Sequence, residues 1–464
     1  MTLDSRMMRK IAALLAITSL FLFLLTACSQ ASTESDSAAE SNSETAVESV
    51  PVEDASEPET EDVTLKVLAM QQAGYTPDEM DEIASQFSET HPGVSVEVSY
   101  LSYDEIYDKL VTSMAGSSPP YDVFLIDDPW VAQFAAAGWL MDVTDRVPQD
   151  VRDGLFAAAW DVTEVNGTTY GMPWMIDQEM FFYNQDLLAQ AGYDAPPTTW
   201  EEMEEMGQAM KEAGLVEYPI IWSWQQAESI ITDFVVLLYG NGGKFLDENN
   251  QPVFNDERGV EVLTWMVNSI ENGTTNPSSI ISNEDAVLNV FSQGNAAFAI
   301  NWPYMYELTQ FNEEESQVTG NVGMSLMPVF AHGADAGVES ATISGSMGFG
   351  IAANSEHPEE AWTYLEYLTS RPVQLAYSAH LPPMWKDLYE EPDVQVLLEQ
   401  NPANEVLVPQ FSEQFQYSIV RPKVTYYTEA STALQLALQE ALSGAKTPQE
   451  ALDDAAAAIV EMQE

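Results

Sequence analysis

The stretch Val63-Thr64-Leu65-Lys66-Val67-Leu68-Ala69 opens the part of the sequence that decides the fold class. Its apolar residues alternate with polar ones at the start, as in a β-strand with one buried face. Helical spacing follows over residues 78–90, a second alternating strand over 94–100, and a second helical pattern over 103–115. The run Val123-Phe124-Leu125-Ile126 is apolar on both sides, which is typical of a strand inside a parallel sheet. Because strand and helix alternate, the sequence predicts an α/β fold with helices covering both faces of a sheet.

A second, helix-rich block runs from about residue 181 to residue 323. Thr199 stands where an N-cap would open a helix, because Ser, Thr, Asp and Asn accept a bond from the first free N–H groups. The pattern predicts helices over residues 200–213, 230–239, 257–272 and 285–293, a hairpin over 245–255, a strand over 346–353 and later helices over 359–369, 434–442 and 452–462.

Composition excludes several classes of protein. The 464 residues include 74 Asp or Glu and 15 Lys or Arg, a formal net charge of −59, and 45% are apolar. That apolar content supports a large core and about two to three domains of roughly 150 residues. A polyanion lacks the clustered cations that nucleic-acid binding requires, so no nucleic-acid partner is expected. The acidity fits either adaptation to high salt or avoidance of anionic cell-envelope polymers.

The sequence offers little material for a metal, a cofactor or catalysis. Its one cysteine excludes a disulfide framework, a zinc ribbon and a redox pair. The four histidines, at positions 91, 332, 357 and 380, have no metal-ligand spacing. No nucleophile elbow or phosphate loop is present. We therefore expect no metal, no cofactor and no catalytic residues.

The amino end has the pattern of a targeting segment. Arg9 and Lys10 precede the apolar run 11–25, and Leu25-Thr26-Ala27-Cys28 resembles the bacterial lipobox. This resemblance implies removal of residues 1–27 and lipidation of Cys28, which would anchor the protein outside the cytoplasm on the cell membrane. A short signal anchor that stays in the membrane is the alternative. Residues 29–62 hold 11 Asp or Glu and no Lys, Arg or aromatic residue, so residues 28–62 are expected to form a disordered tether.

A family resemblance lies in several tracts, taken in order. Tyr170-Gly171-Met172-Pro173-Trp174-Met175-Ile176-Asp177 leads into Phe182-Tyr183-Asn184-Gln185-Asp186-Leu187-Leu188, and Gln293-Gly294-Asn295-Ala296-Ala297-Phe298-Ala299-Ile300-Asn301-Trp302-Pro303 follows. The tracts at 191–202, 345–362 and 442–452 complete the pattern. Together they resemble the extracellular solute-binding proteins of bacterial ABC importers, specifically the carbohydrate-binding family related to maltose-binding proteins.

The resemblance implies an α/β fold of the type II periplasmic-binding-protein kind, with two lobes, an interlobe cleft and hinge crossings. The first lobe would hold residues 63–177 plus 326–372, and the second 179–324 plus 374–464. Crossings would fall near Asp177–Phe181, Met324–Pro328 and Arg371–Tyr377. Closure of such lobes around a ligand is a known hinge motion of periplasmic binding proteins. The implied partners are a carbohydrate and the permease subunits of the importer, with the protein itself a monomer.

Sugars present apolar C–H faces and rings of hydroxyl groups, so a binder needs flat aromatic rings, carboxylates and amides. Trp174 and Asp177 stand three residues apart, and in the resembled family the position of Asp177 commonly holds an acidic ligand-binding residue. Asp127, Asp128 and Trp130 follow the strand 123–126, whose carboxyl end is where open α/β sheets bind ligands. The alternatives are hinge packing for Trp174, a turn cap for Asp177 and an N-cap for one of the other two aspartates.

Further candidates come in pairs and short groups. If Trp222 and Trp224 lie on a strand, only one of them faces the cleft. Trp302 and Tyr304 pose the same choice, because Trp302-Pro303-Tyr304 stands where the resembled family usually has Gly-Pro-Trp. Arg421 would bind sugar hydroxyls or pair with nearby acids. The remaining candidate ligand-binding residues are Gly345, Ser346, Met347, Trp385, Gln72 and Tyr75.

The sequence therefore predicts a substrate-binding protein that captures a sugar or oligosaccharide and delivers it to a permease. Two alternatives remain open. The same fold would suit a cationic solute such as a betaine or polyamine, because tryptophan faces and carboxylates both attract cations. A secreted glycoside hydrolase would need a pair of carboxylates, which this acidic chain has in excess.

Overall fold

The computed structural model describes residues 62–463 except 72–73, 115, 117–119 and 379–380. The expected signal segment (residues 1–27), Cys28 and the tether up to residue 61 lie outside the described residues, as does Gln72. The strands are β1 (Val63–Met70), β2 (Val94–Leu101), β3 (Val123–Asp127), β4 (Glu164–Val165), β5 (Thr168–Thr169), β6 (Gly171–Met175), β7 (Met180–Asn184), β8 (Ile220–Ile221), β9 (Phe298–Asn301), β10 (Val322–Ser325), β11 (Thr342–Ile343), β12 (Met347–Ile351) and β13 (Ser418–Ile419).

The α-helices are α2 (Pro77–Thr90), α3 (Tyr103–Met114), α4 (Val131–Ala136), α5 (Gln149–Gly154), α6 (Gln185–Gln190), α7 (Trp200–Glu212), α8 (Glu228–Gly240), α9 (Glu257–Glu271), α10 (Glu284–Ser292), α11 (Tyr304–Gln310), α12 (Ala331–Asp335), α13 (Pro358–Leu368), α14 (Arg371–Ala376), α15 (Pro392–Gln400), α16 (Asn404–Gln414), α17 (Tyr427–Leu442) and α18 (Pro448–Met462). Short 3-10 helices cover Ala157–Val162, Pro277–Ile281, Lys386–Glu390 and Phe415–Tyr417.

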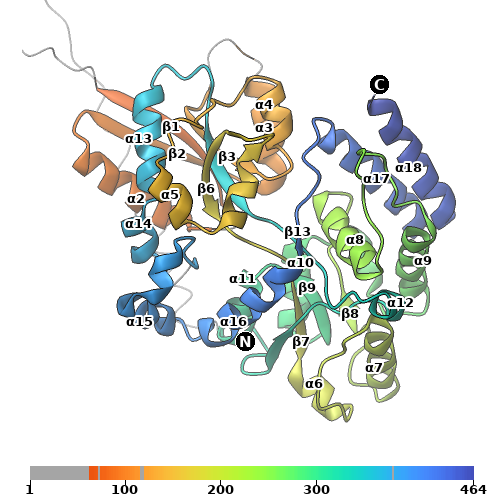
Figure 1. The fold of residues 1–464 in the computed structure, drawn as a ribbon. Helices are drawn as coiled ribbons and strands as arrows, with labels where there is room; N and C mark the ends of the chain where they lie inside the picture. The colour runs from red at the N-terminus through yellow and green to blue at the C-terminus, as the bar shows by residue number, and fades with distance from the viewer. Residues whose placement is uncertain (1–61, 72–73, 115, 117–119, 379–380, 464) are drawn as a thin grey trace, which may run out of the picture. The chain divides into compact units, whose positions relative to one another are not determined.

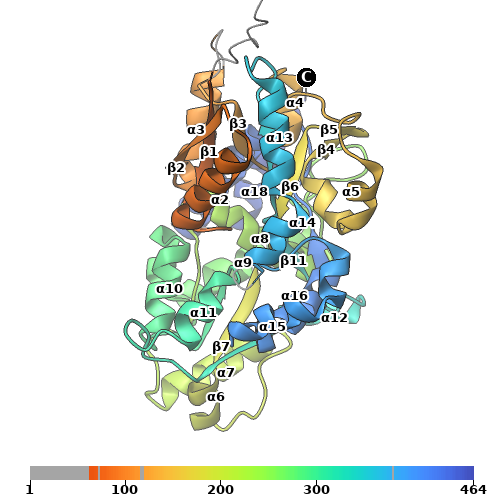
Figure 2. The same ribbon diagram turned by 90° about the vertical axis from the view of Figure 1, so that its left-hand side faces the viewer.

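The first sheet has five strands in the order β2-β1-β3-β12-β6 (Figure 1). Strands β1, β2 and β3 are parallel, and β12 runs antiparallel to both β3 and β6. Helices α2 and α13 lie together in front of this sheet in Figure 2. The helix over residues 77–90, the strand over 94–101 and the buried strand over 123–127 confirm the alternation expected from the sequence.

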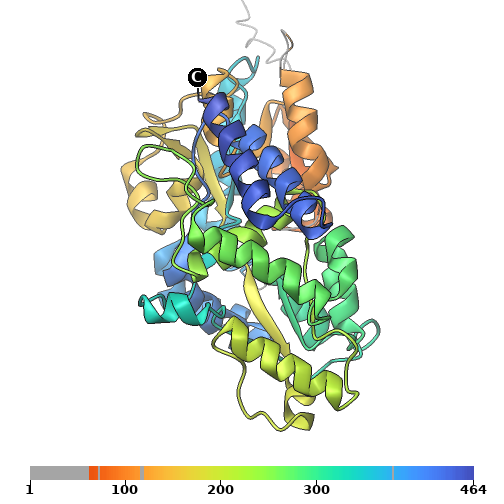
Figure 3. The same ribbon diagram turned by 90° about the vertical axis from the view of Figure 1, so that its right-hand side faces the viewer.

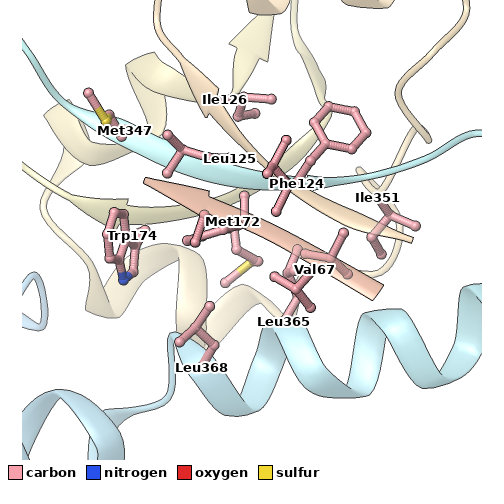
Figure 4. Packing of buried hydrophobic residues seen from close by; sticks show 14 of the residues in the cluster. Val67, Phe124, Leu125, Ile126, Met172, Trp174, Met347, Ile351, Leu365 and Leu368 are labelled. Carbon is pink, nitrogen blue, oxygen red and sulfur yellow. The ribbon is translucent and has the colours of Figure 1, made fainter. Parts of the chain in front are cut away.

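The core of the first sheet packs against α13 (Figure 4). Met172 and Trp174 of β6 lie near Leu365 and Leu368 of that helix, and all four side chains belong to one buried cluster. Trp174 is 1% exposed. Gly74, with φ 75°, leaves room for its ring, because a Cβ there would lie 2.0 Å from Trp174 Cη2. Trp174, from the first tract of the family resemblance, is therefore a core residue in this structure.

The second sheet has four strands in the order β10-β7-β9-β8. Successive residues of β7 face opposite sides, as the period of a strand requires. Phe181 belongs to a cluster with α8, α9, α17 and α18, whereas Met180 and Phe182 belong to a cluster with α10 and α11. Figure 3 shows α17 and α18, in blue, beside α9, in green. Helices thus cover both faces of the second sheet as well.

Local signals set several of these boundaries. Thr199 Oγ1 accepts the N–H of Glu202 at 3.1 Å and opens α7, which confirms the predicted N-cap. The expected hairpin over residues 245–255 is a turn closed by the Leu246–Pro252 bridge and by the Val253 N–H bond to Phe245 O, with no regular strands.

The chain passes between the two sheets where β6 leads into β7, and again between β10 and β12. Beyond the expected third crossing near residues 371–377, Met384 still packs in the core of the first sheet, and Ala403 packs beneath the second. The lobe boundaries at residues 177, 324 and 372 stay predictions. Among the described residues, none of the helices has both the length and the apolar character needed to cross a bilayer.

Candidate functional site

A cavity lies where the ends of strands from both sheets meet. In the first sheet, Met347 of β12 pairs with Asp127 at the end of β3 and with Met175 at the end of β6. In the second sheet, Met180 at the start of β7 pairs with Asn301 at the end of β9. These ends carry the residues that surround the cavity, as expected for open α/β sheets, which bind ligands beyond the carboxyl ends of their strands.

The cavity has a volume of about 130 Å³. The lining residues come from strand ends, helix starts and crossings, and they are Met70, Tyr103, Asp127, Asp177, Gln225, Ala227, Glu228, Ser229, Thr232, Asn283, Glu284, Asp285, Trp302, Tyr304, Gly345, Met347 and Arg421. We call this space the first compartment.

Arg421 forms one wall and is surrounded by carboxylates. Its Nη2 lies 2.7 Å from Asp127 Oδ1 and 2.6 Å from Asp128 Oδ1, and its Nη1 lies 3.3 Å from Glu228 Oε1. The side chain of Arg421 is 3% exposed and that of Asp127 is completely buried. Burial alone would lower the pKa of Arg421, but the charges of Asp127 and Asp128 outweigh it and raise that pKa well above its usual value. The guanidinium therefore stays charged. The acids that pair with it come from the end of β3 and from the start of α8.

Hydroxyl groups complete this ionic cluster. Tyr103 donates to Asp127 Oδ2 at 2.6 Å, and Tyr427 donates to Glu228 Oε1 at 2.6 Å. Burial, and then the charge of Asp127, raise the pKa of Tyr103 well above its usual value, so its hydroxyl stays a donor. Burial also raises the pKa of Asp128, although Arg421 opposes that shift. The ionisation of Asp128 and that of Arg421 therefore depend on each other.

Asp177 faces the cavity from the crossing between β6 and β7. Its Oδ1 accepts the N–H of Gln178 at 2.8 Å, its own N–H donates to Ser346 Oγ at 3.1 Å, and its carbonyl accepts the N–H of Gly345 at 2.9 Å. Burial raises the pKa of this partly buried carboxyl to about 8, and the bond from Gln178 partly offsets the shift. Near neutral pH the group is mostly a neutral carboxylic acid that can donate as well as accept a hydrogen bond.

Trp302 gives the cavity a flat aromatic surface. It is partly buried, directly after β9, and its ring lies against Gly345 from the segment before β12. A Cβ on Gly345 would approach Trp302 Cζ3 to 2.4 Å, so the close contact requires glycine there. Tyr304, two residues further on, also lines the cavity, and burial raises the pKa of its hydroxyl. Both members of this predicted pair reach the candidate site.

Two helices begin at the cavity. Asn283 caps α10 by accepting the N–H of Ala286 at 3.0 Å, and α8 begins at Glu228 without a side-chain cap. Free N–H groups at helix starts attract oxygen atoms and partial negative charge. Carboxylates and the first turns of two helices thus surround one small space.

The structure brings together seven of the sequence-predicted site residues at the first compartment: Asp127, Asp177, Trp302, Tyr304, Gly345, Met347 and Arg421. Asp128 and Ser346 lie directly behind them, bonded to Arg421 and to the backbone of Asp177. Trp130 stacks on Tyr103, with ring centroids 5.4 Å apart, and lines a neighbouring space.

Of the other five candidates, four are buried core residues in this structure, and the fifth, Trp385, is partly buried against the core. Trp222 and Trp224 are both 0% exposed and stack on each other at 5.0 Å. One of them was expected to face the cleft, but both side chains are buried. Strand alternation does not apply to them, because β8 ends at Ile221. Trp174 and Tyr75 pack edge to face in the first core, and Trp385 donates its Nε1–H to Thr369 O at 3.1 Å.

Six further residues that were not expected from the sequence also line the first compartment: Tyr103, Gln225, Glu228, Asn283, Glu284 and Asp285. A signal existed for four of them, because Glu228, Asn283, Glu284 and Asp285 stand at the starts of predicted helices, where polar residues gather around free N–H groups. Nothing local marks Tyr103 or Gln225. Among the residues that the structure describes, no group of three or more His, Cys, Asp or Glu is arranged to hold a metal ion.

Comparison with known proteins agrees with this geometry. Residues 73–375 match the family described as bacterial extracellular solute-binding proteins. A probable ABC transporter-binding protein of Deinococcus radiodurans is 29% identical over 57% of this chain and 64% of its own length. The chain thus spans slightly less than two thirds of that relative.

Solved structures share the whole described fold. Maltose-bound MalE3 of T. maritima is 27% identical, with a TM-score of 0.76, over 86% of this chain and 100% of that one. A solute-binding protein of Thermotoga lettingae bound with α-D-tagatose is 25% identical, with a TM-score of 0.74, over the same shares. The α/β, two-lobe periplasmic-binding-protein fold expected from the sequence is confirmed. The chain belongs to the family of bacterial extracellular solute-binding proteins.

Proposed function

We propose that this protein captures a neutral sugar or polyol in the first compartment and delivers it to the permease of an ABC importer. The observation that supports it most directly is the Trp302 surface beside Asp177. An aromatic face packs against the C–H side of a pyranose or polyol chain, and a neutral carboxylic acid both donates to and accepts from hydroxyl groups. Structural neighbours that hold maltose and tagatose support the same ligand class.

The proposed hinge closure requires that the closed state binds the ligand more tightly than the open state does. Ion pairs join Arg421 to Asp127, at the end of β3, and to Glu228, at the start of α8. A ligand that contacts both Asp127 and Trp302 would favour the approach of the first sheet and the second. Hinge closure at the crossings is therefore part of the proposal. Small-angle scattering should give a smaller radius of gyration at saturating ligand, and an unchanged radius would contradict closure.

Isothermal titration of the protein without residues 1–27 tests the ligand class. Maltose, D-tagatose and D-mannitol represent the proposed class, and glycine betaine and spermidine represent cationic solutes. The proposal expects saturable binding within the first group that Trp302→Ala weakens at least tenfold. Binding of the cationic solutes alone would overturn it.

A cationic solute is the second candidate, and one specific observation favours it. Asp177, Glu284 and Asp285 line the first compartment, and the one cation among its lining residues, Arg421, is already paired with acids. A cation would also stack on Trp302. The raised pKa of Asp177 favours the neutral ligand, because a neutral carboxyl attracts a cation less strongly.

A non-enzymatic role is part of the proposal, supported by the transport-binding relatives. Incubation with labelled oligosaccharides should give no product beyond one equivalent of protein, and sustained turnover would favour the glycoside-hydrolase alternative.

Family membership supports an extracytoplasmic location, and the lipobox supports anchoring through Cys28. Cys28→Ser should move the protein from the membrane fraction to the soluble fraction. Retention of that variant on membranes would favour the signal-anchor alternative. Sedimentation should give a monomer.

A further inference from the structure

Two buried carboxyl groups lie beside the first compartment. Glu179 stands in the crossing between β6 and β7, and Asp233 lies in the second turn of α8. Glu179 is 2% exposed and Asp233 is completely buried. Glu179 Oε2 and Asp233 Oδ1 have no hydrogen-bond partner among the described residues. Since a buried polar atom without a partner is costly, these two oxygens require a donor that the surrounding side chains do not supply.

Glu179 stands where the two crossings of the chain contact each other. Its N–H donates to Ile343 O at 3.2 Å, and its carbonyl accepts the hydroxyl of Thr342 at 2.6 Å. Thr342 and Ile343 make up β11, which lies in the other passage of the chain between the two sheets, from β10 to β12. The surroundings of Glu179 would therefore change if the proposed hinge closes.

Asp233 connects this region to the wall of the first compartment. Its Oδ2 accepts the hydroxyl of Ser223 at 3.1 Å. The residue before it, Thr232, lines the compartment, and the hydroxyl of Thr232 lies close enough to the Glu179 carboxyl to interact with it. One turn of α8 thus faces both the candidate ligand site and Glu179.

The surroundings of the two acids carry more negative than positive charge. Burial, and then the charge of Asp233, raise the pKa of Glu179 well above its usual value, and Glu284 at the start of α10 adds to the shift. Burial also raises the pKa of Asp233, again with a contribution from Glu284. Arg421 opposes the shift at Glu179, but its guanidinium is already paired with three other acids. Two carboxyls buried in this way do not both ionise near neutral pH, and a proton on one of them supplies a donor that two carboxylates lack.

A ligand in the first compartment should make this proton harder to remove. Glu284 lines the compartment, and its charge acts on both acids. A bound sugar replaces water beside Glu284, and negative charges repel one another more strongly where water is excluded. Loss of the proton therefore costs more with ligand bound than without it. Since the coupling of two binding sites is reciprocal, a protein that has lost the proton binds the ligand more weakly.

We propose that Glu179 and Asp233 share one proton beside the first compartment and that this proton strengthens ligand binding, so that affinity decreases as the pH rises. This inference rests on the proposed function and adds the regulation of the same site. Asp177 also lines the compartment and keeps a proton near neutral pH, so the variants below retain Asp177 and change only the pair.

Isothermal titration at pH 6 and pH 9 tests it, with whichever of maltose, D-tagatose and D-mannitol binds most tightly at pH 6. The affinity of the parent protein should be lower at pH 9 by a factor of about five or more. The double variant Glu179→Gln/Asp233→Asn is neutral at these two positions at either pH. It should bind as tightly as the parent at pH 6 and several-fold more tightly than the parent at pH 9. Equal affinities of the variant and the parent at pH 9 would assign the pH dependence to Asp177 and overturn the inference.

The double variant Glu212→Gln/Asp335→Asn is the matched control, because it removes one Glu and one Asp that are exposed, on α7 and α12. It should lose affinity between pH 6 and pH 9 as the parent does. Should the first double variant not fold, Asp233→Asn alone takes its place. That change leaves Glu179 without the acid that repels its charge, so this variant should likewise bind more tightly than the parent at pH 9.

Two further outcomes are decisive. A parent protein with the same affinity at both pH values would overturn the inference and leave the proposed function standing. If none of the three sugars binds at pH 6, the proposed function fails and this inference fails with it.

Discussion

Arg421 Nη2 and Asp127 Oδ1 lie 2.7 Å apart although 294 positions separate them in the sequence. Asp127 ends a strand of the first sheet, and Arg421 follows β13, which pairs with β11. The ion pair also forms part of the wall of the first compartment. We therefore expect the stability of the protein and the proposed ligand binding to depend on the same buried contact.

Replacing Arg421 should destabilise the protein strongly. Arg421→Met would leave Asp127 buried without its counter-ion, which typically costs about 3–5 kcal/mol of unfolding free energy. Urea unfolding followed by tryptophan fluorescence measures this change. Arg146→Met is the matched control, because Arg146 pairs with the largely exposed Glu359 and its loss should have a much smaller effect. Equal losses in the two variants would show that burial of the Arg421 pair contributes nothing.

Trp174 and Trp302 should respond in opposite ways to the same change. Trp174→Ala removes a fully buried ring from the first core and should cost about 3–5 kcal/mol of unfolding free energy. Trp302→Ala should weaken ligand binding and change stability less, because its ring is partly exposed in the cavity. Thermal unfolding and titration of both variants check this. If the Trp174→Ala protein were as stable as the parent but bound ligand more weakly, Trp174 would have to be counted among the ligand-binding residues.

Gly345 should act on the ligand through Trp302. Gly345→Ala places a methyl group against the indole ring and should weaken binding about tenfold, or about 1.4 kcal/mol. If the effect passes only through the ring, adding Gly345→Ala to Trp302→Ala should change affinity by less than about 0.5 kcal/mol. A full additional loss in the double variant would instead indicate direct backbone contact between ligand and Gly345.

Buried acids should make the protein less stable as the pH rises. Burial raises the pKa of Asp233 to about 8, although Ser223 donates to its Oδ2 at 3.1 Å. The pKa of an unfolded aspartate is about 3.9. Between these values the folded state keeps a proton that the unfolded state has lost, so the unfolding free energy falls with increasing pH. The contribution is complete below pH 4 and is lost by about pH 8.

Urea unfolding at pH 5, 6, 7 and 8 measures this dependence. Asp233→Asn should flatten the slope, and the exposed Asp335→Asn should leave it as in the parent protein. Asp177, whose pKa is also raised to about 8, contributes with the same sign and remains in both variants. Identical slopes in all three proteins would contradict a proton on Asp233.

The elements of the fold were predictable where a period and a boundary signal coincide. The strand over residues 63–70 alternates at its start, α7 begins at the Thr199 cap, and β3 is apolar on both sides because helices cover both faces. These signals are local, so a single sequence contains them. A domain boundary depends on which hydrophobic core a segment packs in, and no local sequence pattern indicates this.

The candidate site was predictable only in part for a related reason. Asp127 and Asp177 follow strands, and that position alone marks them. Tyr103 was missed because its partner Asp127 lies 24 positions away. Glu228 stands at a helix start, but its pairing with Arg421, 193 positions away, leaves no local pattern. Trp222 and Trp224 show the opposite case, in which predicted site residues lie in the core. An aromatic pair near a strand end can pack in a hydrophobic core as readily as against a ligand.

The first compartment draws its walls from stretches between residues 70 and 421. During translation, the wall is therefore incomplete until Arg421 has left the ribosome. A nascent chain that ends before residue 421 lacks part of the proposed binding surface.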